Sequence, residues 1–578
     1  MKLELQHGSR SRILAGLVLV IMAVFVIRLF YLQIIQHDYY TELASSEQVK
    51  RLTIPAKRGL IYALDGDKPV QLVMNETVYT VFADPKITTD DEAIIETVRK
   101  VAGGNARANL QELLDKKESR YQILATKVSR AQAEKIKEAD LSGVGFQEET
   151  QRVYPEGSLA AQTLGFVDFE GNGKYGVEGG LNERLLGKDG LLQSVTDVRD
   201  VPLSIGNRNI NQPAKDGDDI VLSIDRNVQS YAEQALAAGL QRTGAANGSV
   251  LVMDPQTGKI MAMANLPTYK PAEFNKVEDA ALFNNGVVST PYEPASVVKT
   301  FTYAAGIEKG VITPATTYLN TDSITVDDRT ISNATRGQTG VITMQHAFNW
   351  SLNTGTVTIA QRLGDGTTIT RGARDIMYDY FYNRFGLGQY TGIEVSGEAL
   401  GEVVSPADAE GSAVRYSNMS FGQGMNVTMV QVASAFSSTI NGGRYYKPTV
   451  IAGVIDEEGE YKPVETKPLR NTVNEATSEQ IQEVTRAARA TFYSRVDRPG
   501  YTIGGKTGTS ETIKNGKYVD SQTIGSYVGY GGTDEPRYVI MVQVSGKDQA
   551  MQGARDALPI FTDISNWMID YLKLQPKG

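Results

Sequence analysis

The N-terminal part of the chain carries one long apolar run. Every residue from Ile13 to Ile27 is apolar or glycine, and after Arg28 a largely apolar pattern continues to Ile35. A helix rises about 1.5 Å per residue, so residues 13–35 are long enough to cross a hydrocarbon core of about 30 Å. The pattern predicts a transmembrane anchor at residues 13–35, in which Arg28 reaches the headgroups or faces a partner helix.

Basic residues precede this segment, namely Lys2, Arg10 and Arg12. Positive charge favours the cytoplasmic side, so we expect residues 1–12 to form a cytoplasmic tail and the rest of the chain to be exported. A cleaved signal peptide is the alternative. No small-x-small cleavage site follows the apolar run at the expected distance, so we expect the segment to be retained as a single-pass anchor.

Residues 36–216 contain no constellation of catalytic side chains. Thr89–Glu92 has the pattern of a capping box, and Ile94 and Val98 then lie on one face of a predicted helix. Loops punctuated by glycine and proline separate the other elements. We expect an elongated, mixed α+β, non-catalytic module, called the pedestal below, which ends in the polar stretch Gly206–Gly217.

The pattern changes in residues 217–578. Strand-like runs lie near both ends of this region, and the middle is mostly helical. The predicted strands are Asp219–Ile224, Gly248–Asp254, Lys259–Ala264, Tyr501–Thr509, Thr523–Tyr530 and Arg537–Ser545, followed by a helix at Pro559–Leu572. This order predicts an α/β (α+β) domain in which both ends pair into one sheet and the inserted helices form a second lobe.

Composition excludes several classes of protein. The 578 residues carry a net charge of −9, and nucleic-acid binding needs clustered positive charge. The absence of cysteine excludes thiol catalysis, and the three scattered histidines make a zinc site or a Ser-His-Asp hydrolase a poor fit. We expect no metal and no cofactor.

Three short motifs carry candidate chemistry, and each occurs once, in a fixed order. They are Ser296-Val297-Val298-Lys299, Ser351-Leu352-Asn353 and Lys506-Thr507-Gly508. Each motif alone is a weak signal. Together they supply a nucleophile, a proton relay and an anion anchor, which predicts a serine enzyme that transfers acyl groups.

The spacing within the motifs explains this assignment. Pro294 predicts a helix start, so Ser296 lies in the first turn and Lys299 one turn later on the same face. A lysine must lose its proton to act as a base, and burial beside the charge of Lys506 lowers its pKa. Lys506–Thr509 is predicted as an edge strand along which an extended substrate can pair.

The chain resembles the class B penicillin-binding proteins, which are monofunctional D,D-transpeptidases that cross-link peptidoglycan. The resemblance extends nearly from end to end. Besides the anchor, it rests on Pro55–Gly59, Val153–Pro155, Gly176–Glu178, Tyr292–Lys299, Phe421–Gly424 and Gly505–Thr509. Two positions depart from the family pattern: Ala295 replaces a common glycine, and Tyr62–Gly66 replaces the usual Asp-Arg-Asn-Gly.

The resemblance implies a role for each motif residue. Ser296 attacks the penultimate D-Ala carbonyl and Lys299 activates it, while Ser351 and Asn353 shuttle protons and bind the peptide. The substrate-binding strand comprises Lys506, Thr507, Gly508 and Thr509, and its lysine and threonines hold the terminal carboxylate. The backbone N–H groups of Ser296 and Thr509 form the oxyanion hole.

The resemblance also implies a setting. It places a penicillin-binding transpeptidase domain at residues 217–578, after a dimerisation-type pedestal at residues 36–216, in a bacterial cell membrane. The implied partners are lipid II-derived glycan strands with their stem peptides, β-lactam antibiotics, a SEDS-type glycosyltransferase, and other membrane proteins of the divisome or elongasome. The pedestal loops favour septal synthesis in cell division, and lateral elongation is the alternative.

Three other activities compete with this interpretation. A β-lactamase or β-lactam sensor shares the motifs, but the chain has no clear signature of a water-activating glutamate, and it carries an anchor and a pedestal. A bifunctional enzyme needs a glycosyltransferase domain, for which residues 37–216 are short. A catalytically silent scaffold of wall synthesis conflicts with the complete motifs, and covalent labelling of Ser296 by penicillin distinguishes it from an enzyme.

Overall fold

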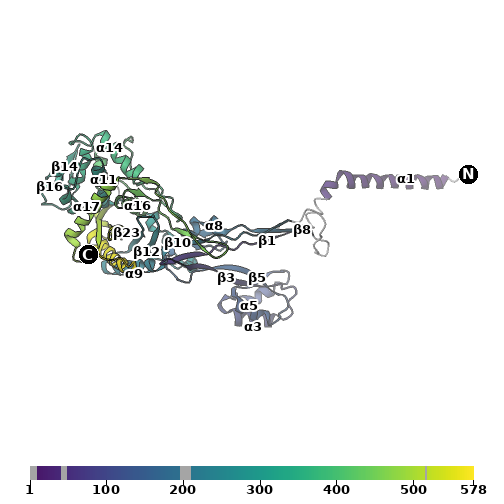
Figure 1. The fold of residues 1–578 in the computed structure, drawn as a ribbon. Helices are drawn as coiled ribbons and strands as arrows, with labels where there is room; N and C mark the ends of the chain where they lie inside the picture. The colour runs from purple at the N-terminus through teal and green to yellow at the C-terminus, as the bar shows by residue number, and fades with distance from the viewer. Residues whose placement is uncertain (1–8, 41–48, 196–209, 515–516, 578) are drawn as a thin grey trace. The chain divides into compact units, whose positions relative to one another are not determined.

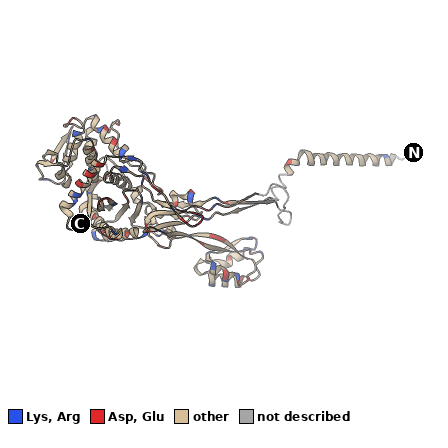
Figure 2. Cartoon of the chain, viewed as in Figure 1, with Lys and Arg blue, Asp and Glu red and all other residues tan. Residues whose placement is uncertain are grey.

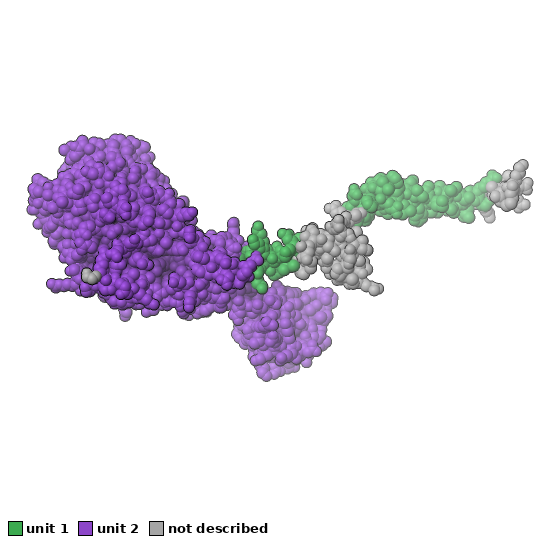
Figure 3. Space-filling view, in the orientation of Figure 1, with its two compact units in different colours: residues 1–57, 187–217 green, residues 58–186, 218–578 purple. Residues whose placement is uncertain are grey.

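The computed structural model describes residues 9–40, 49–195, 210–514 and 517–577 (Figure 1). It divides into two compact units, one of residues 1–57 and 187–217, the other of residues 58–186 and 218–578 (Figure 3). Residues 1–8 of the expected cytoplasmic tail and residues 206–209 of the expected linker lie outside the described residues.

The first unit contains the apolar N-terminal helix. Helix α1 (Ser9–Phe30) continues into the π-helical turn η1 (Tyr31–Ile35). An 18-residue stretch within Ser11–Ile35 has a mean hydropathy of 2.9, and most large apolar side chains of this segment are exposed. Figure 2 shows this helix as a stretch almost without charged residues. It is long and apolar enough to cross a membrane.

The same unit contains one small antiparallel sheet. Its strand order is β1 (Val49–Ile54), β8 (Gly190–Val195) and β9 (Ile210–Gln212). The backbone N–H groups of Ala56 and Lys57 donate to the carboxylates of Asp189 and Asp216, at 2.8 and 2.9 Å. Segments far apart in the sequence are joined in this way.

The second unit contains the central sheet, which is antiparallel throughout. Its strand order is β12 (Ile260–Leu266), β11 (Asn247–Met253), β23 (Pro536–Ser545), β22 (Lys517–Gly532) and β21 (Thr502–Lys514). Strands from the start and the end of the catalytic region pair side by side, which confirms the predicted fold class.

Helices cover both faces of the central sheet (Figure 1). Helices α9 (Arg226–Thr243) and α18 (Leu558–Tyr571) pack on one face, over buried residues such as Val250 and Ile540. The opposite face packs against the helical lobe. Its helices are α11 (Lys299–Glu308), α12 (Met344–Asn349), α13 (Asn353–Arg362), α14 (Arg371–Tyr378), α15 (Ala413–Met419), α16 (Met429–Ile440) and α17 (Glu475–Tyr493). Every residue of α16 is buried, so it forms the centre of this lobe.

The helical lobe also contains short strands and helices. Two hairpin-like pairs, β13 (Thr317–Asn320) with β16 (Gly340–Thr343) and β14 (Ser323–Val326) with β15 (Arg329–Ser332), lie between α11 and α12 in the sequence. The short helix α10 (Gly286–Ser289) precedes the first motif.

One predicted strand pairs differently from the expectation. Strand β10 (Asp219–Asp225) was predicted at Asp219–Ile224, but it does not join the central sheet. It pairs in parallel with β2 (Ile61–Asp65) and antiparallel with β18 (Ile451–Ile455). The second sheet therefore draws strands from both sides of residue 216, because β10 lies between a pedestal strand and a strand of the catalytic region.

Strands β3 (Lys68–Ala83), β4 (Gln122–Ser129) and β5 (Val144–Val153) of this second sheet lead into a small lobe. Strand β19 (Tyr461–Pro463) pairs with β18 at the opposite end of the sheet. Helices α3 (Asp91–Ala102), α4 (Leu110–Leu114) and α5 (Arg130–Lys137) pack on β3 and β4 around their own core. The predicted helix is α3, but its cap is Asp90, whose carboxylate accepts the N–H of Ala93 at 2.9 Å.

A buried ion cluster joins three segments of the pedestal. Glu178 of α7 (Gly176–Gly180) is fully buried, and its carboxylate accepts hydrogen bonds from Arg58 at 2.5 Å and Arg152 at 2.7 Å. Arg58 belongs to the family-like segment Pro55–Gly59, and Arg152 lies on β5. Two guanidinium groups therefore depend on one carboxylate for their charge balance.

The first prediction concerns this cluster. Glu178→Gln keeps the side-chain volume but leaves two arginines without a counter-charge, so we expect the free energy of unfolding to fall by about 3–5 kcal/mol. Urea denaturation of the full chain in detergent measures the change. Glu134→Gln, in the exposed pair with Arg130, is the matched control and should lower stability by under about 1 kcal/mol. Equal losses in both variants would contradict a structural role for the cluster.

Candidate active site

The predicted nucleophile lies at the junction of two helical segments. Ser296 is in the 3-10 turn η5 (Ala295–Val298), and the α-helix itself begins only at Lys299. The expected single helix from Pro294 is therefore a 3-10 turn followed by α11. The Ser296 side chain remains partly exposed, whereas Val297 and Lys299 are buried. Only the serine of this turn faces the cleft.

Ala295 adopts an unusual backbone conformation, with φ of +50°. A left-handed conformation costs a residue with a Cβ atom roughly 1 kcal/mol, which explains why the family often has glycine here. The N–H of Ala295 donates to the carbonyl of Gly422 at 2.9 Å. A Cβ atom on Gly422 would lie 2.0 Å from the Ala295 carbonyl oxygen. The Phe421–Gly424 loop therefore holds the nucleophile turn in place at van der Waals distance.

The second motif forms a turn between two helices. Ser351 has φ of +55° and links α12 to α13, which begins at Asn353. Both side chains point toward the same lysine. The Nζ of Lys299 donates to the Ser351 carbonyl at 2.6 Å, to the Ser351 Oγ at 3.3 Å and to the Asn353 Oδ1 at 2.8 Å. The predicted turn geometry is present in the structure.

The third motif lies on β21, the last strand of the central sheet. Among the described strands β21 pairs only with β22, so its outer edge is open to an extended ligand. The Nζ of Lys506 donates to the Ser351 Oγ at 2.9 Å, and to the carbonyl and Oγ1 of Thr507 at 3.2 and 3.3 Å. Ser351 thus bridges Lys299 and Lys506.

Strand β21 runs close against the nucleophile turn. A Cβ atom on Gly508 would lie 2.8 Å from the carbonyl of Pro294 and 2.9 Å from a methyl group of Val297. Only glycine permits this approach. The hydroxyl of the following residue, Thr509, accepts the N–H of Gly553 at 3.1 Å. The strand that carries the third motif is therefore fixed beside the nucleophile turn.

Burial controls the charge of both lysines. Lys299 is 1% exposed and Lys506 is 4% exposed. Burial lowers the pKa of Lys299 well below its usual range, and the nearby charge of Lys506 lowers it further. Burial also lowers the pKa of Lys506, to about 7. Lys506, expected as a permanent cation, is therefore only partly protonated near neutral pH in the unliganded site.

Two contacts around the site were not predicted from the sequence. The side chain of Glu293 accepts the N–H of Gly424 at 2.7 Å, which ties the segment before Ser296 to the Phe421–Gly424 loop. The amide of Asn353 donates to the Ser332 carbonyl at 2.9 Å. These partners lie far away in the sequence, and no local pattern identifies them.

An aromatic cavity adjoins Lys506. Its volume is about 220 Å³, and Trp350, Phe492, Lys506 and Thr507 contribute to its walls. The rings of Trp350 and Phe492 meet edge to face at 5.2 Å between centroids. The cavity therefore combines aromatic rings with the Lys506 and Thr507 side chains next to the third motif.

Comparison with known families and structures agrees with this geometry. The model "Penicillin binding protein transpeptidase domain" matches residues 248–566, which is more than half of the chain, and "Penicillin-binding Protein dimerisation domain" matches residues 53–222. The chain belongs to the class B penicillin-binding proteins. It is a serine-type D,D-transpeptidase of that family.

Relatives cover almost the whole chain. Penicillin-binding protein PbpB of Mycolicibacterium smegmatis is 30% identical over 96% of this chain and 88% of its own length. Stage V sporulation protein D of Bacillus subtilis is 29% identical over 98% of this chain and 87% of its own. Penicillin Binding Protein 2X from Streptococcus thermophilus shares the fold, with a TM-score of 0.73 at 21% identity over 91% of this chain and 80% of that one.

The second prediction separates the two lysines. Lys299→Arg replaces a group that can be neutral with one that stays charged, so penicillin acylation should fall by about 10²–10⁴-fold. Lys506→Arg keeps a cation but changes its shape, so acylation should persist, weakened by roughly tenfold. The second-order rate of acylation across pH measures both.

The pH profile adds an internal check on these variants. Wild-type acylation by a carboxylate-bearing penicillin should decline as pH rises through about 7, because Lys506 then loses its proton and its hold on the carboxylate. The decline should move to higher pH in Lys506→Arg. Near-normal acylation by Lys299→Arg would remove Lys299 as the base and assign that role to Ser351 or water.

Proposed function

We propose that this transpeptidase cross-links peptidoglycan stem peptides through an acyl-enzyme on Ser296, formed with a D-Ala-D-Ala terminus. The arrangement that carries the proposal is the contact of Ser351 with both Lys299 and Lys506. The amines of two lysines and the hydroxyl between them then lie in one chain of hydrogen bonds. This chain can take a proton at one end and hold an anion at the other.

The acylation step follows from this chain of groups. The Ser296 Oγ attacks the carbonyl carbon of the penultimate D-Ala, and the hydroxyl proton passes to neutral Lys299. The oxyanion receives hydrogen bonds from the backbone N–H groups of Ser296 and Thr509. The intermediate collapses, the C–N bond breaks, and the proton returns through Ser351 to the nitrogen of the departing D-Ala.

Substrate orientation is assigned to β21. Lys506, Thr507 and Thr509 hold the terminal carboxylate, whose negative charge restores the proton on Lys506. Gly508 allows the substrate backbone to lie against the strand, and Asn353 binds the peptide amide. A second stem peptide then supplies an amine that attacks the acyl carbonyl and releases Ser296. A β-lactam acylates the same serine because its strained amide presents the same carbonyl and carboxylate.

The cellular assignment is also a proposal. We propose a single-pass protein of the bacterial cell membrane, with a cytoplasmic N-terminus and the catalytic domain outside. We further propose a role in septal wall synthesis beside a SEDS-type glycosyltransferase, because the pedestal loops resemble that branch. An elongation-specific role is the alternative, and the position of the tagged protein at the septum or the side wall distinguishes the two.

The third prediction tests the nucleophile. Ser296→Ala should abolish covalent labelling by a fluorescent penicillin while the protein stays folded, because the attacking oxygen is removed. Ser230→Ala on α9, remote from the motifs, is the matched control and should label normally. Mass spectrometry of the wild-type protein should place the adduct on Ser296. An adduct on another residue contradicts the assignment, and rapid loss of the adduct by hydrolysis favours a β-lactamase.

The fourth prediction tests the membrane partner. Replacing residues 13–35 with an unrelated apolar span of equal length should preserve export and penicillin labelling, since both need only an anchor. Wall synthesis in cells should fail, because the side chains that contact the partner are lost. Growth rescue in a depletion strain measures this effect. Full rescue by the unrelated span shows that the segment is only an anchor.

A further inference from the structure

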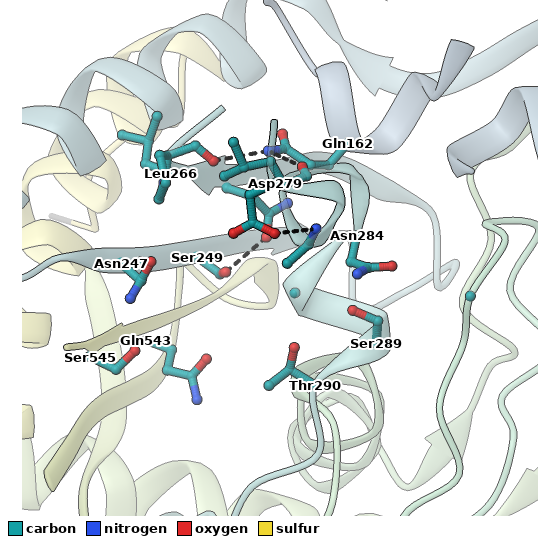
Figure 4. Close-up of a pocket in the computed structure, with 17 residues that line it drawn as sticks. Gln162, Asn247, Ser249, Leu266, Asp279, Asn284, Ser289, Thr290, Gln543 and Ser545 are labelled. Carbon is teal, nitrogen blue, oxygen red and sulfur yellow. Dashed lines mark hydrogen bonds between the residues drawn. The ribbon is translucent and has the colours of Figure 1, made fainter. Parts of the chain in front are cut away.

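A second cavity, of about 650 Å³, lies outside the three motifs (Figure 4). Residues of β11, β12 and β23 form its floor, and α10 with the segment before it forms the opposite wall. Figure 4 shows Asn247, Gln543 and Ser545 on one side, facing Ser289 and Thr290 on the other. Its volume is in the range of sites for small molecules or short oligomers.

The lining of this cavity is polar and nearly uncharged. Five side-chain amides and four hydroxyls contribute to it: Gln162, Asn247, Asn265, Asn284, Gln543, Ser249, Ser289, Thr290 and Ser545. Asp279 is the one ionisable residue in the lining, which includes no lysine, arginine or histidine. A lining of this kind offers no counter-charge to a phosphate or carboxylate. It suits a neutral ligand that both donates and accepts hydrogen bonds.

Gln543 is the most informative residue of the floor. Its side chain is 8% exposed and lines the cavity, within a strand whose neighbouring residues are apolar. Among the described residues its amide has no hydrogen-bond partner. The amide faces the cavity, so the cavity wall carries a donor and an acceptor that no protein group uses.

A fixed hydrogen-bond chain orders the groups beside Gln543. Ser249 donates to Asn265 at 2.8 Å, Asn265 donates to Asn285 at 3.1 Å, and Asn285 donates to Thr163 at 3.2 Å. Thr163 then donates to the carbonyl of Met263 at 3.2 Å. Every proton direction in the chain is therefore set. Ser249 presents its lone pairs to the cavity, and Asn265 retains one free N–H.

The cavity lies on the same face of the sheet as the nucleophile. Ser249 pairs with Gln543, Gln543 with Ser526, and Ser526 with Gly508. Residues directly opposite in antiparallel strands share a face, and on this face Gly508 meets the nucleophile turn. Strands are spaced about 4.8 Å apart, which places Gln543 about 10 Å from Gly508.

We propose that this cavity binds a neutral, N-acetylated sugar unit of a glycan strand. Hydroxyl and acetamido groups both donate and accept hydrogen bonds, as the floor requires. A stem peptide of about four residues spans about 14 Å when extended, so one strand can occupy the cavity and still present its peptide near Ser296. The proposal rests on the proposed function, since the glycan is part of the cross-linked substrate.

The floor argues against a peptide as the occupant. Peptides that extend a sheet need a strand edge with unpaired backbone groups. Strands β11 and β23 are interior strands, paired on both sides, so the floor offers side chains rather than backbone. Strand β12 forms an edge, but it ends at Leu266 directly before Pro267, and proline provides no N–H group.

Binding of a peptide-free probe to the full chain in detergent tests the proposal. The probe is the tetrasaccharide of β-1,4-linked N-acetylglucosamine, detected by saturation-transfer NMR and titrated by calorimetry. Gln543→Leu should weaken its affinity by about tenfold, the effect of losing one buried hydrogen bond. Asn284→Ala, at the exposed rim, should weaken it by several-fold without a change in the core.

Controls separate the possible outcomes. Gln234→Leu, which changes an amide in a neighbouring groove, should bind the probe as the wild type does. Penicillin labelling of every variant reports a folded active site, and its absence in the wild type would contradict the proposed function rather than this site. Unchanged probe affinity in both cavity variants overturns the proposal. Binding of a free stem pentapeptide that depends on Gln543 also overturns the proposal.

Discussion

The burial of two lysines around one serine hydroxyl is the constraint on which the catalytic site depends. An ammonium group removed from water loses solvation energy, and a second one nearby adds repulsion. Burial and the neighbouring charge of Lys506 lower the pKa of Lys299 well below its usual range, and burial lowers the pKa of Lys506 to about 7. The lowered pKa lets Lys299 lose its proton more readily, which its proposed role as a base requires. In the proposed mechanism the negative charge of the substrate carboxylate favours the protonated form of Lys506.

The fold positions these groups through backbone contacts that only small residues permit. Gly508 lets β21 approach the nucleophile turn, and Gly422 lets the Phe421–Gly424 loop hold Ala295 in a left-handed conformation. In the central sheet, strands from the start of the catalytic region pair with strands from its end. Ser296, Ser351 and Lys506 therefore come from three different parts of the chain, and tertiary packing alone brings them together.

The comparison of sequence with structure shows which information is local. The alternating and helical patterns predicted the strands of the central sheet, and motif spacing predicted that Ser351 and Asn353 face one cleft. The pairing of β10 with β2 and β18 was missed, because strand partners depend on packing far away in the sequence. The 3-10 turn at Ser296 was missed as well, since its conformation depends on Gly422. The sequence does contain a local indication of Gln543, because this one amide interrupts the apolar run from Val539 to Val544.

Direct titration of the two ε-amino groups tests the central claim. Lysine labelled with ¹³C at Cε and ¹⁵N at Nζ, in the full chain and in Lys299→Arg for assignment, reports each protonation state by NMR. The account predicts that the pKa of Lys299 lies well below the range of free lysine, and that Lys506 titrates near pH 7. Two ammonium groups that both persist to about pH 9, close to the range of free lysine, would contradict it.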